Sequence, residues 1–411
     1  MAKTLWGKVY YKDTYAGHLQ EEPGGRVVFA YDSTYIQENQ PAIAHALPLR
    51  PEPFLSERGL PPFFDNLVAE GWFRNAQAKA LGVNPNNRFS LLLGFGYDLA
   101  GAVSVIDPEP QEHYSLDNAD ETTLAVLLGR ASISGIQRKI LVVKEGSEFR
   151  PVRPNELSTH IAKLTSGNLH DIQALEFLTT LAVSKLLPHD EVVKMEIATI
   201  PAIHEKALVI SRFDRSPTGK RLHHFEEFNQ LLGRFPGNKY DGDYEEMGRF
   251  ILHTPGCIPV EADRLFCRIL ACLLVGNTDA HFKNFAMFHT RDGLRLTPLY
   301  DLVASSVYKE YQDVALKIGG IPNMSIGKLK EKHLLAMGKG FGVKSEAVVT
   351  VIKALGKQLP NALDAVEKSC VGTAILRKKL IEKMERRWKG SFVLTGRRLL
   401  QKQNKDGEHK G

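Results

Sequence analysis

GNTDAHFKNFAMF, residues 276–288, places polar side chains directly after the most apolar helix that the sequence predicts. That helix spans residues 261–275, and apolar side chains occupy most of its circumference, which is typical of a buried helix. Gly276 follows it, and glycine commonly ends a helix. Asp279 and Asn284 therefore lie close to a hydrophobic core, where polar side chains need a partner or a function.

The same stretch continues into a predicted β-hairpin. Residues 285–288 and 294–296 are short apolar segments, and residues 290–293 (Thr-Arg-Asp-Gly) have the composition of a hairpin turn. Asn284 precedes the first strand and Asp301 follows the second. Neighbouring antiparallel strands lie about 5 Å apart, so we expect these two side chains to meet at the open end of the hairpin, beside Asp279.

The residue types at this open end favour metal-assisted phosphoryl transfer. Two converging carboxylates repel each other unless a cation joins them, and Mg²⁺ prefers a few such oxygen ligands together with substrate phosphates. The interval from Asp279 to Asn284 is that of a kinase catalytic loop, with Asp301 in place of the later metal-binding aspartate. Asp and Asn are also frequent turn residues after a helix, which is the structural alternative.

A kinase also needs a cation for the nucleotide phosphates, usually a Lys on a strand paired with a Glu on a helix. Lys163 lies within an apolar strand predicted over residues 160–164, and Glu176 lies inside an apolar helix predicted over 172–186. Either residue alone would more often be a surface group on an apolar stem. As a pair they predict the smaller lobe of a kinase.

The remaining pattern is rich in strands at first and helical later. We expect a β-meander, then one helix from Phe64 to Leu81, tight turns over residues 94–101 and a linker over 108–121. Beyond residue 225 the chain is predicted to be mainly helical. The other predicted strands span residues 5–11, 15–19, 26–31, 140–143, 192–200 and 207–213.

Composition and charge limit the class of protein. The chain has 411 residues, 43% of them apolar, which predicts a soluble protein of two or three domains. The sequence lacks an apolar run of the ~20 residues that a membrane span needs and a signal peptide, so we expect a cytoplasmic protein without membrane contact. Residues 377–411 carry a net charge of +8 and the remainder −2. This basic tail either contacts nucleic acid or an acidic partner, or is a solvated helix with a frayed end.

Several stretches besides the opening one carry a family resemblance. They are Ser132-Ile-Ser-Gly-Ile-Gln-Arg-Lys139, Thr159-His-Ile-Ala-Lys163, Ser211-Arg-Phe-Asp214, Leu296-Thr-Pro-Leu-Tyr-Asp301, Pro62-Phe-Phe-Asp-Asn-Leu67, Glu70-Gly71 and Gly101-Ala-Val103. With these stretches the chain resembles the HipA-type serine/threonine kinases, the toxin halves of bacterial toxin–antitoxin pairs. The resemblance runs to about residue 390.

The resemblance implies an α+β, protein-kinase-like fold of two lobes with an N-terminal β-rich subdomain. The expected segments are an N-terminal HipA-type subdomain (1–107), a nucleotide-binding N-lobe (120–215), a catalytic and metal-binding C-lobe (216–390) and a basic, frayed tail (391–411).

The resemblance also assigns roles to residues around ATP and Mg²⁺. Asp279 would be the catalytic base, and Asn284 and Asp301 would bind Mg²⁺. Leu175-Glu176 stands where the family usually has Asn-Glu. Ser134 would be autophosphorylated, with Ser132 as the alternative. The ATP-contacting residues would be Ser134, Gly135, Ile136, Gln137, Arg138 and Lys139 of a phosphate-facing loop, Lys163, Ser211, Arg212 and Phe213 of the adenine hinge, and His281, Lys283 and Asn284.

For partners, the resemblance implies a small HipB-like helix-turn-helix antitoxin and, through it, operator DNA. It also implies a protein substrate such as an aminoacyl-tRNA synthetase, glutamyl-tRNA synthetase first among them, whose phosphorylation would cause growth arrest and persistence. Two alternatives are a lipid or small-molecule kinase, because Asp279-Ala-His-Phe-Lys-Asn284 is also similar to the loop of phosphoinositide kinases, and a non-catalytic co-repressor with a kinase fold.

Overall fold

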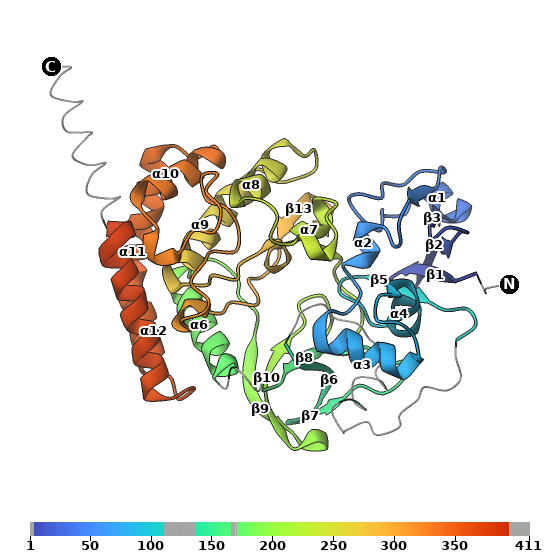
Figure 1. Ribbon diagram of the computed structural model, residues 1–411, viewed down its shortest axis with the longest axis horizontal. Helices are drawn as coiled ribbons and strands as arrows, with labels where there is room; N and C mark the ends of the chain where they lie inside the picture. The colour runs from blue at the N-terminus through green and yellow to red at the C-terminus, as the bar shows by residue number, and fades with distance from the viewer. Residues whose placement is uncertain (1–3, 111–122, 124–136, 166–168, 170, 394–411) are drawn as a thin grey trace. The chain divides into compact units, whose positions relative to one another are not determined.

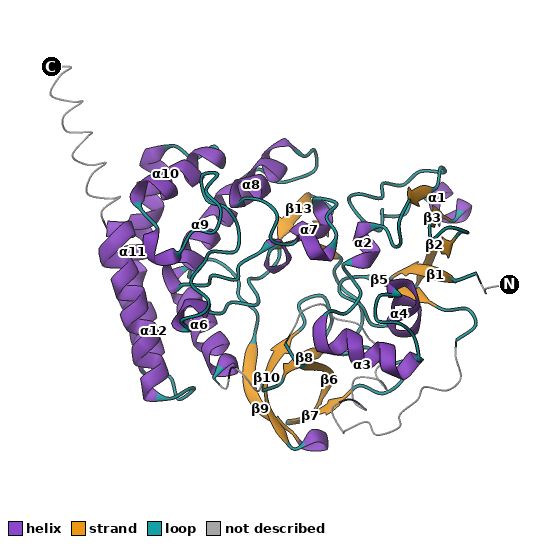
Figure 2. Cartoon of the chain, viewed as in Figure 1, coloured by secondary structure: helices purple, strands orange, loops and turns teal. Residues whose placement is uncertain are grey.

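The computed structural model describes residues 4–110, 123, 137–165, 169 and 171–393. The chain folds into two compact units, residues 1–170 with 194–238 and residues 171–193 with 239–411. Strands are concentrated in the first unit and helices in the second (Figure 2). These units do not follow the segments expected from the sequence, because residues 171–193 belong to the second unit and residues 216–238 to the first.

The first unit begins with an antiparallel sheet of five strands. Its spatial order is β4-β3-β2-β1-β5, so the predicted meander of the first three strands is confirmed. Buried side chains such as Val9, Leu19 and Phe29 form its core together with Phe64 and Leu92. The elements are β1 (Trp6–Tyr11), β2 (Thr14–Glu21), β3 (Val27–Tyr31), α1 (Ser33–Gln37), β4 (Phe54–Ser56), α2 (Pro62–Asp65), α3 (Gly71–Leu81), α4 (Arg88–Phe95) and β5 (Val103–Ile106).

The single helix predicted from Phe64 to Leu81 is wrong. The chain forms two helices there, α2 and α3, and Gly71 at the start of α3 has a φ of 57°. Leu67 and Val68, which lie between them, are buried without being helical. Their apolar spacing continued the helical period, although tertiary packing explains it here. The predicted end is right, because Gly82 follows Leu81 in the left-handed conformation.

A second antiparallel sheet of five strands, in the order β7-β6-β8-β10-β9, completes most of the first unit. Ile140, Val142 and Ala162 on one face pack with Phe73 and Ala80 of α3, which lies over the sheet (Figure 1). All four predicted strands of this region are present. The elements are β6 (Lys139–Glu145), β7 (Glu148–Pro151), β8 (His160–Lys163), β9 (Met195–Ile200), β10 (Glu205–Ser211), β11 (Phe225–Glu227) and α7 (Phe228–Leu231).

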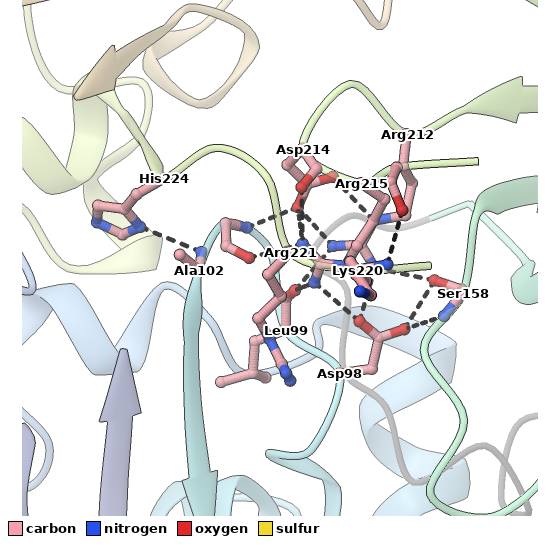
Figure 3. Close-up of polar contacts among 12 residues, drawn as sticks. Asp98, Leu99, Ala102, Ser158, Arg212, Asp214, Arg215, Lys220, Arg221 and His224 are labelled. Carbon is pink, nitrogen blue, oxygen red and sulfur yellow. Dashed lines mark hydrogen bonds and ion pairs between the residues drawn. The ribbon is translucent and has the colours of Figure 1, made fainter. Parts of the chain in front are cut away.

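A buried network of ion pairs joins the turn after α4 to the second sheet (Figure 3). Asp98 Oδ1 accepts hydrogen bonds from Arg212 at 3.0 Å and from Arg215 at 2.9 Å. Its other oxygen, Oδ2, accepts from the main-chain N–H of Ser158 at 2.9 Å and from the Ser158 hydroxyl at 2.7 Å. Asp214 accepts from Arg212 at 2.6 Å and from Arg215 at 2.7 Å.

The network is electrically balanced, with two carboxylates against two guanidinium groups. All four side chains are at most 4% exposed. Burial alone would raise the pKa of Asp98, but the charges of Arg212 and Arg215 lower it to about 2. Removing one partner from such a buried cluster leaves an uncompensated charge, which is far costlier than losing a solvated ion pair. The two sheets of the first unit are therefore coupled through these four residues.

The second unit is built around α9 (Val260–Val275), the buried helix that the sequence predicts. Gly276 ends it in the left-handed conformation, with φ of 85°. The predicted hairpin is also present, as β12 (Ala286–Thr290) and β13 (Gly293–Leu296). In the described part of the chain, all helices are too short or too polar to cross a membrane. The other helices are α6 (Ile172–Leu186), α8 (Tyr244–His253), α10 (Glu331–Gly340), α11 (Ser345–Glu367) and α12 (Ala374–Arg387).

Part of the basic tail belongs to this fold. Leu380 and Met384 of α12 are buried, and Arg387 donates hydrogen bonds to the main-chain oxygen of Leu274 and to the hydroxyl of Ser306. Residues 377–393 therefore are not a free basic arm, and α12 is more than a solvated helix. The predicted tail, residues 391–411, lies mostly outside the described residues, as does most of the predicted linker.

We predict that Asp98→Ala destabilises the protein by about 3–5 kcal/mol, because it leaves Arg212 and Arg215 buried with one carboxylate between them. Chemical denaturation followed by circular dichroism measures the change. Glu22→Ala, which breaks a half-exposed ion pair to Arg26, is the matched control and should cost less than about 1 kcal/mol. Equal effects of the two substitutions would contradict the structural role assigned to the network.

Candidate active site

The loop that follows α9 is held by hydrogen bonds on both of its sides. The hydroxyls of Thr278 and Ser305 lie 2.7 Å apart, and the Thr278 hydroxyl also donates to the main-chain oxygen of Tyr311 at 2.9 Å. Residues Phe282–Asn284 form one turn of 3₁₀-helix. In this loop Asp279 is exposed, whereas His281, Lys283 and Asn284 are buried. The loop thus presents one carboxylate to solvent from an otherwise fixed backbone.

Asn284 and Asp301 meet, as the hairpin predicts. Asn284 Nδ2 donates a hydrogen bond to Asp301 Oδ2 at 2.8 Å, and Asn284 Oδ1 accepts one from the His281 N–H at 3.0 Å. These two bonds fix which end of the amide carries the oxygen. Asp301 has a φ of 55°, a left-handed conformation that aspartate tolerates better than most residues. The preceding Tyr300 donates its hydroxyl proton to the Lys283 carbonyl at 2.8 Å, which ties the two loops together.

The paired side chains fit Mg²⁺. An amide oxygen has two lone pairs, so the bond from His281 leaves Asn284 Oδ1 able to accept a second partner. With the Asp301 carboxylate it supplies the hard oxygen ligands that Mg²⁺ prefers, few enough to leave room for water and phosphate oxygens. Asn284 and Asp301 are the residues that would hold the ion.

Asp279 has the properties of a proton acceptor. Protein groups around it displace part of the water from its carboxylate, and this desolvation, with the negative charge of Asp301, raises its pKa to about 6. The Tyr240 hydroxyl, which donates to Asp279 Oδ1 at 2.9 Å, and the charge of Lys239 act in the opposite direction. A carboxylate whose pKa lies near neutrality is a stronger base than an ordinary aspartate and is still mostly ionised at pH 7.

In the first unit, two lysines of the predicted nucleotide site are cross-strand neighbours. Lys139 on β6 pairs directly with Lys163 on β8, and both are less than 10% exposed. Ala162 and Leu164 point into the core, so Lys163 and its neighbour Lys139 share the opposite face of the sheet. Two neighbouring ammonium groups are the kind of cation that the predicted phosphate site requires.

The predicted hinge, residues 211–213, begins at the last residue of β10. The Arg212 side chain is fully engaged in the buried network, and its N–H donates to the Thr159 carbonyl at 2.9 Å. Any contact between Arg212 and a nucleotide would therefore use its carbonyl oxygen. Ser211 donates its N–H to the Lys194 carbonyl at 2.9 Å, and the ring of Phe213 packs against Phe225 at 5.0 Å.

Other predicted site residues stay predictions. Ser132, Ser134, Gly135 and Ile136 lie outside the described residues. Gln137 is half-buried, with its amide 3.4 Å from the Leu164 carbonyl.

Glu176 is fully buried on α6 in the second unit, whereas Lys163 belongs to the first unit, and their pairing stays a prediction. His281 Nδ1 accepts a hydrogen bond from the Lys283 N–H at 3.2 Å, so the imidazole ring also stabilises the conformation of the loop.

Sequence reasoning missed Tyr240 and Ser305. Tyr240 precedes Asp279 by 39 positions and Ser305 follows Thr278 by 27, and neither belongs to a recognisable motif. Only the fold brings these hydroxyls to the loop. A weak signal exists for Ser305, because it lies four residues beyond the predicted metal ligand Asp301.

Comparison with known proteins identifies the family. The HipA N-terminal domain matches residues 7–106, and the HipA-like C-terminal domain matches residues 131–363. The Sinorhizobium fredii protein Y4dM is 31% identical over 321 residues, which cover 71% of this chain and 75% of that protein. The serine/threonine-protein kinase toxin HipA of Shewanella oneidensis is 27% identical over 344 residues, covering 74% of this chain and 76% of the toxin.

Two solved structures share the fold. A chain in the Shewanella oneidensis complex of HipA, HipB and operator DNA matches with a TM-score of 0.76 and 22% identity, over 95% of this chain and 99% of that chain. The Helicobacter pylori proinflammatory kinase CtkA matches with a TM-score of 0.50 and 11% identity, over 66% of this chain and 93% of that one. The expected α+β, kinase-like fold is thereby confirmed. The two domain matches cover most of the sequence, and the chain belongs to the HipA family of kinase toxins.

Proposed function

We propose that this protein is an ATP-dependent serine/threonine kinase that transfers the γ-phosphate of ATP to a protein hydroxyl. The observation that carries the proposal is the 2.8 Å contact between Asn284 and Asp301, two residues from the expected Mg²⁺ site. Asp279, on the loop that leads to Asn284, has a pKa near 6. Such a combination of oxygen ligands and a base suits phosphoryl transfer, in which catalysis is mainly positioning and charge stabilisation.

Each group has a distinct task in this proposal. Asp279 accepts the proton of the attacking hydroxyl, and its raised pKa suits that role. Lys163 and Lys139 attract phosphate oxygens of the nucleotide. Asn284 and Asp301 would hold Mg²⁺, which would neutralise charge on the phosphates. The main chain at residues 211–213 would receive the adenine.

The biological setting is inferred from the family. The Shewanella oneidensis relative is a toxin solved with HipB and operator DNA, which supports a helix-turn-helix antitoxin as the partner of this chain. We propose that the antitoxin neutralises the kinase and links it to operator DNA. The substrate would be a protein such as an aminoacyl-tRNA synthetase, whose phosphorylation would halt growth and favour persistence.

Autophosphorylation of Ser134 is proposed as the off-switch. A phosphate adds about −1.5 to −2 charges. Next to the segment that leads into Lys139, it would compete with the phosphates of ATP for the same cationic groups. Mass spectrometry after incubation with Mg·ATP distinguishes Ser134 from the alternative, Ser132.

We predict that Asp279→Asn abolishes transfer of labelled phosphate from ATP to proteins of a bacterial lysate. Removing a general base typically lowers the rate about 10²-fold to 10⁴-fold. The thermal shift on adding Mg·ATP should persist, because Asp279 is not a nucleotide-holding group in this account. Labelled protein bands made by the parent enzyme distinguish a protein kinase from a lipid or small-molecule kinase. Activity of the variant within about threefold of the parent would exclude Asp279 as the base.

Asp279→Asn should also stabilise the metal-free protein above pH 6. The pKa of the folded state is about 6, above the ordinary value of 3.8, so the folded protein binds this proton more tightly than the unfolded chain. Ionisation of Asp279 therefore reduces stability as pH rises from about 4 to 6. The melting temperatures of the variant and parent should agree at pH 4 and separate by pH 8. A lower melting temperature of the variant at pH 8 would contradict the raised pKa.

Asp301→Asn should weaken the metal site itself. The variant keeps the side-chain shape but removes the negative charge that attracts Mg²⁺, so the thermal shift caused by Mg·ATP should shrink strongly. Asp292→Asn, at the tip of the β12–β13 hairpin, is a matched control that should keep the full shift. An undiminished shift in Asp301→Asn would show that Asp301 is not a metal ligand.

A further inference from the structure

Tyr240 lies against the carboxylate of Asp279. Its hydroxyl donates a hydrogen bond to Asp279 Oδ1 at 2.9 Å. Both residues belong to the second unit, and Tyr240 is 43% exposed. An exposed tyrosine bonded to a proposed catalytic base is therefore in the right place to act on it.

The backbone around Tyr240 is fixed to the catalytic loop. The Phe282 N–H donates to the Lys239 carbonyl at 3.3 Å, and the Tyr244 hydroxyl donates to the Ala280 carbonyl at 2.9 Å. Gly242 lies so close to the loop that a Cβ there would be 2.6 Å from the ring of Phe282. Three contacts, made by residues before and after Tyr240, thus hold its backbone against the catalytic loop. The fold therefore sets the position of its hydroxyl.

The ring of Tyr240 is held as well. Its edge contacts the imidazole of His281, with the ring centres 5.0 Å apart and the planes at 77°. The ammonium group of Lys239 lies 5.5 Å from the ring centre. In the described part of the chain, Asp301 from the loop after β13 and Tyr244 from α8 also interact electrostatically with Asp279.

We propose that Tyr240 is a positioning residue for the kinase reaction proposed above, holding one oxygen of Asp279 so that the other faces the acceptor hydroxyl. In that step the O–H bond of the acceptor breaks and its proton passes to the second oxygen of Asp279. The acceptor oxygen forms a bond to the γ-phosphorus as the bond from that phosphorus to the bridging oxygen breaks, which releases ADP. Tyr240 keeps its own proton throughout.

This arrangement has a chemical advantage. A hydrogen bond to one oxygen restrains rotation of the carboxylate. The other oxygen then keeps one orientation toward the acceptor hydroxyl. The bond also favours the ionised form of Asp279, which counters the effects of desolvation and of Asp301. The base therefore remains able to accept a proton in a site crowded with negative charge.

The test is Tyr240→Phe, which removes the hydroxyl and keeps the ring. Tyr311→Phe is the matched control, because Tyr311 is similarly exposed, at 49%, and meets the loop through its main-chain oxygen. With Mg·ATP saturating, transfer by Tyr240→Phe should fall about 10-fold to 100-fold, the range expected for a hydrogen bond to a charged group. The acid limb of the pH–rate profile should move to higher pH, while KM for ATP stays unchanged. Tyr311→Phe should behave as the parent.

A second readout does not depend on kinase activity. Carbon-13 NMR of the Asp279 carboxyl in protein without metal or nucleotide should give a midpoint near pH 6, and Tyr240→Phe should raise it. Identical midpoints in the two proteins would overturn the proposal, as would transfer by Tyr240→Phe within about threefold of the parent with an unmoved acid limb. If the parent transfers phosphate to no acceptor, the kinase function fails, and the titration still tests the contact between Tyr240 and Asp279.

Discussion

The hydrogen bond between Asn284 and Asp301 is the constraint on which the candidate active site depends. It closes the open end of the β12–β13 hairpin, whose register pairs Met287 with Leu296 and Thr290 with Gly293. A slip of one residue in that register would turn every side chain of the strand to the other face. The two-residue turn and the buried faces of both strands therefore decide whether an amide and a carboxylate converge.

Other residues of the second unit support the start of the loop that follows α9. Ser306 donates its hydroxyl proton to the Gly276 carbonyl at 2.8 Å, and Arg387 of α12 donates to Ser306 and to the end of α9. Gly276 has a φ of 85°, and a Cβ there would lie 2.3 Å from the Ser306 hydroxyl oxygen, so another residue at this position would be strained. A cation at the C-terminus of a helix is also favourable to its dipole. The C-terminal helix thus supports the start of the catalytic loop, which explains why the basic tail is partly structural.

The parts of the candidate site that could be predicted are those with signals in a short stretch of sequence. A buried helix ended by glycine, a turn sequence and two polar residues flanking two strands were enough to bring Asn284 and Asp301 together. The sequence could not predict contacts that only the fold creates. Asp98 is bonded to Arg212 and Arg215, which follow it by more than 110 positions in the sequence. Tyr240 is bonded to Asp279, which follows it by 39 positions. The helix expected from Phe64 to Leu81 failed for the related reason that buried loop residues can continue an apolar period.

We propose that Asn284 and Asp301 bind the metal that accompanies the nucleotide. Mn²⁺ takes the same oxygen ligands as Mg²⁺ and is paramagnetic, so it broadens the NMR signals of nearby nuclei. The decisive measurement is the spectrum of the protein with a non-hydrolysable ATP analogue and a trace of Mn²⁺. If Asn284 and Asp301 bind the metal, the side-chain amide signals of Asn284 and the main-chain amide signal of Asp301 disappear before the other assigned signals of the second unit. Sharp signals from Asn284 and Asp301 with broadening elsewhere would contradict the proposal.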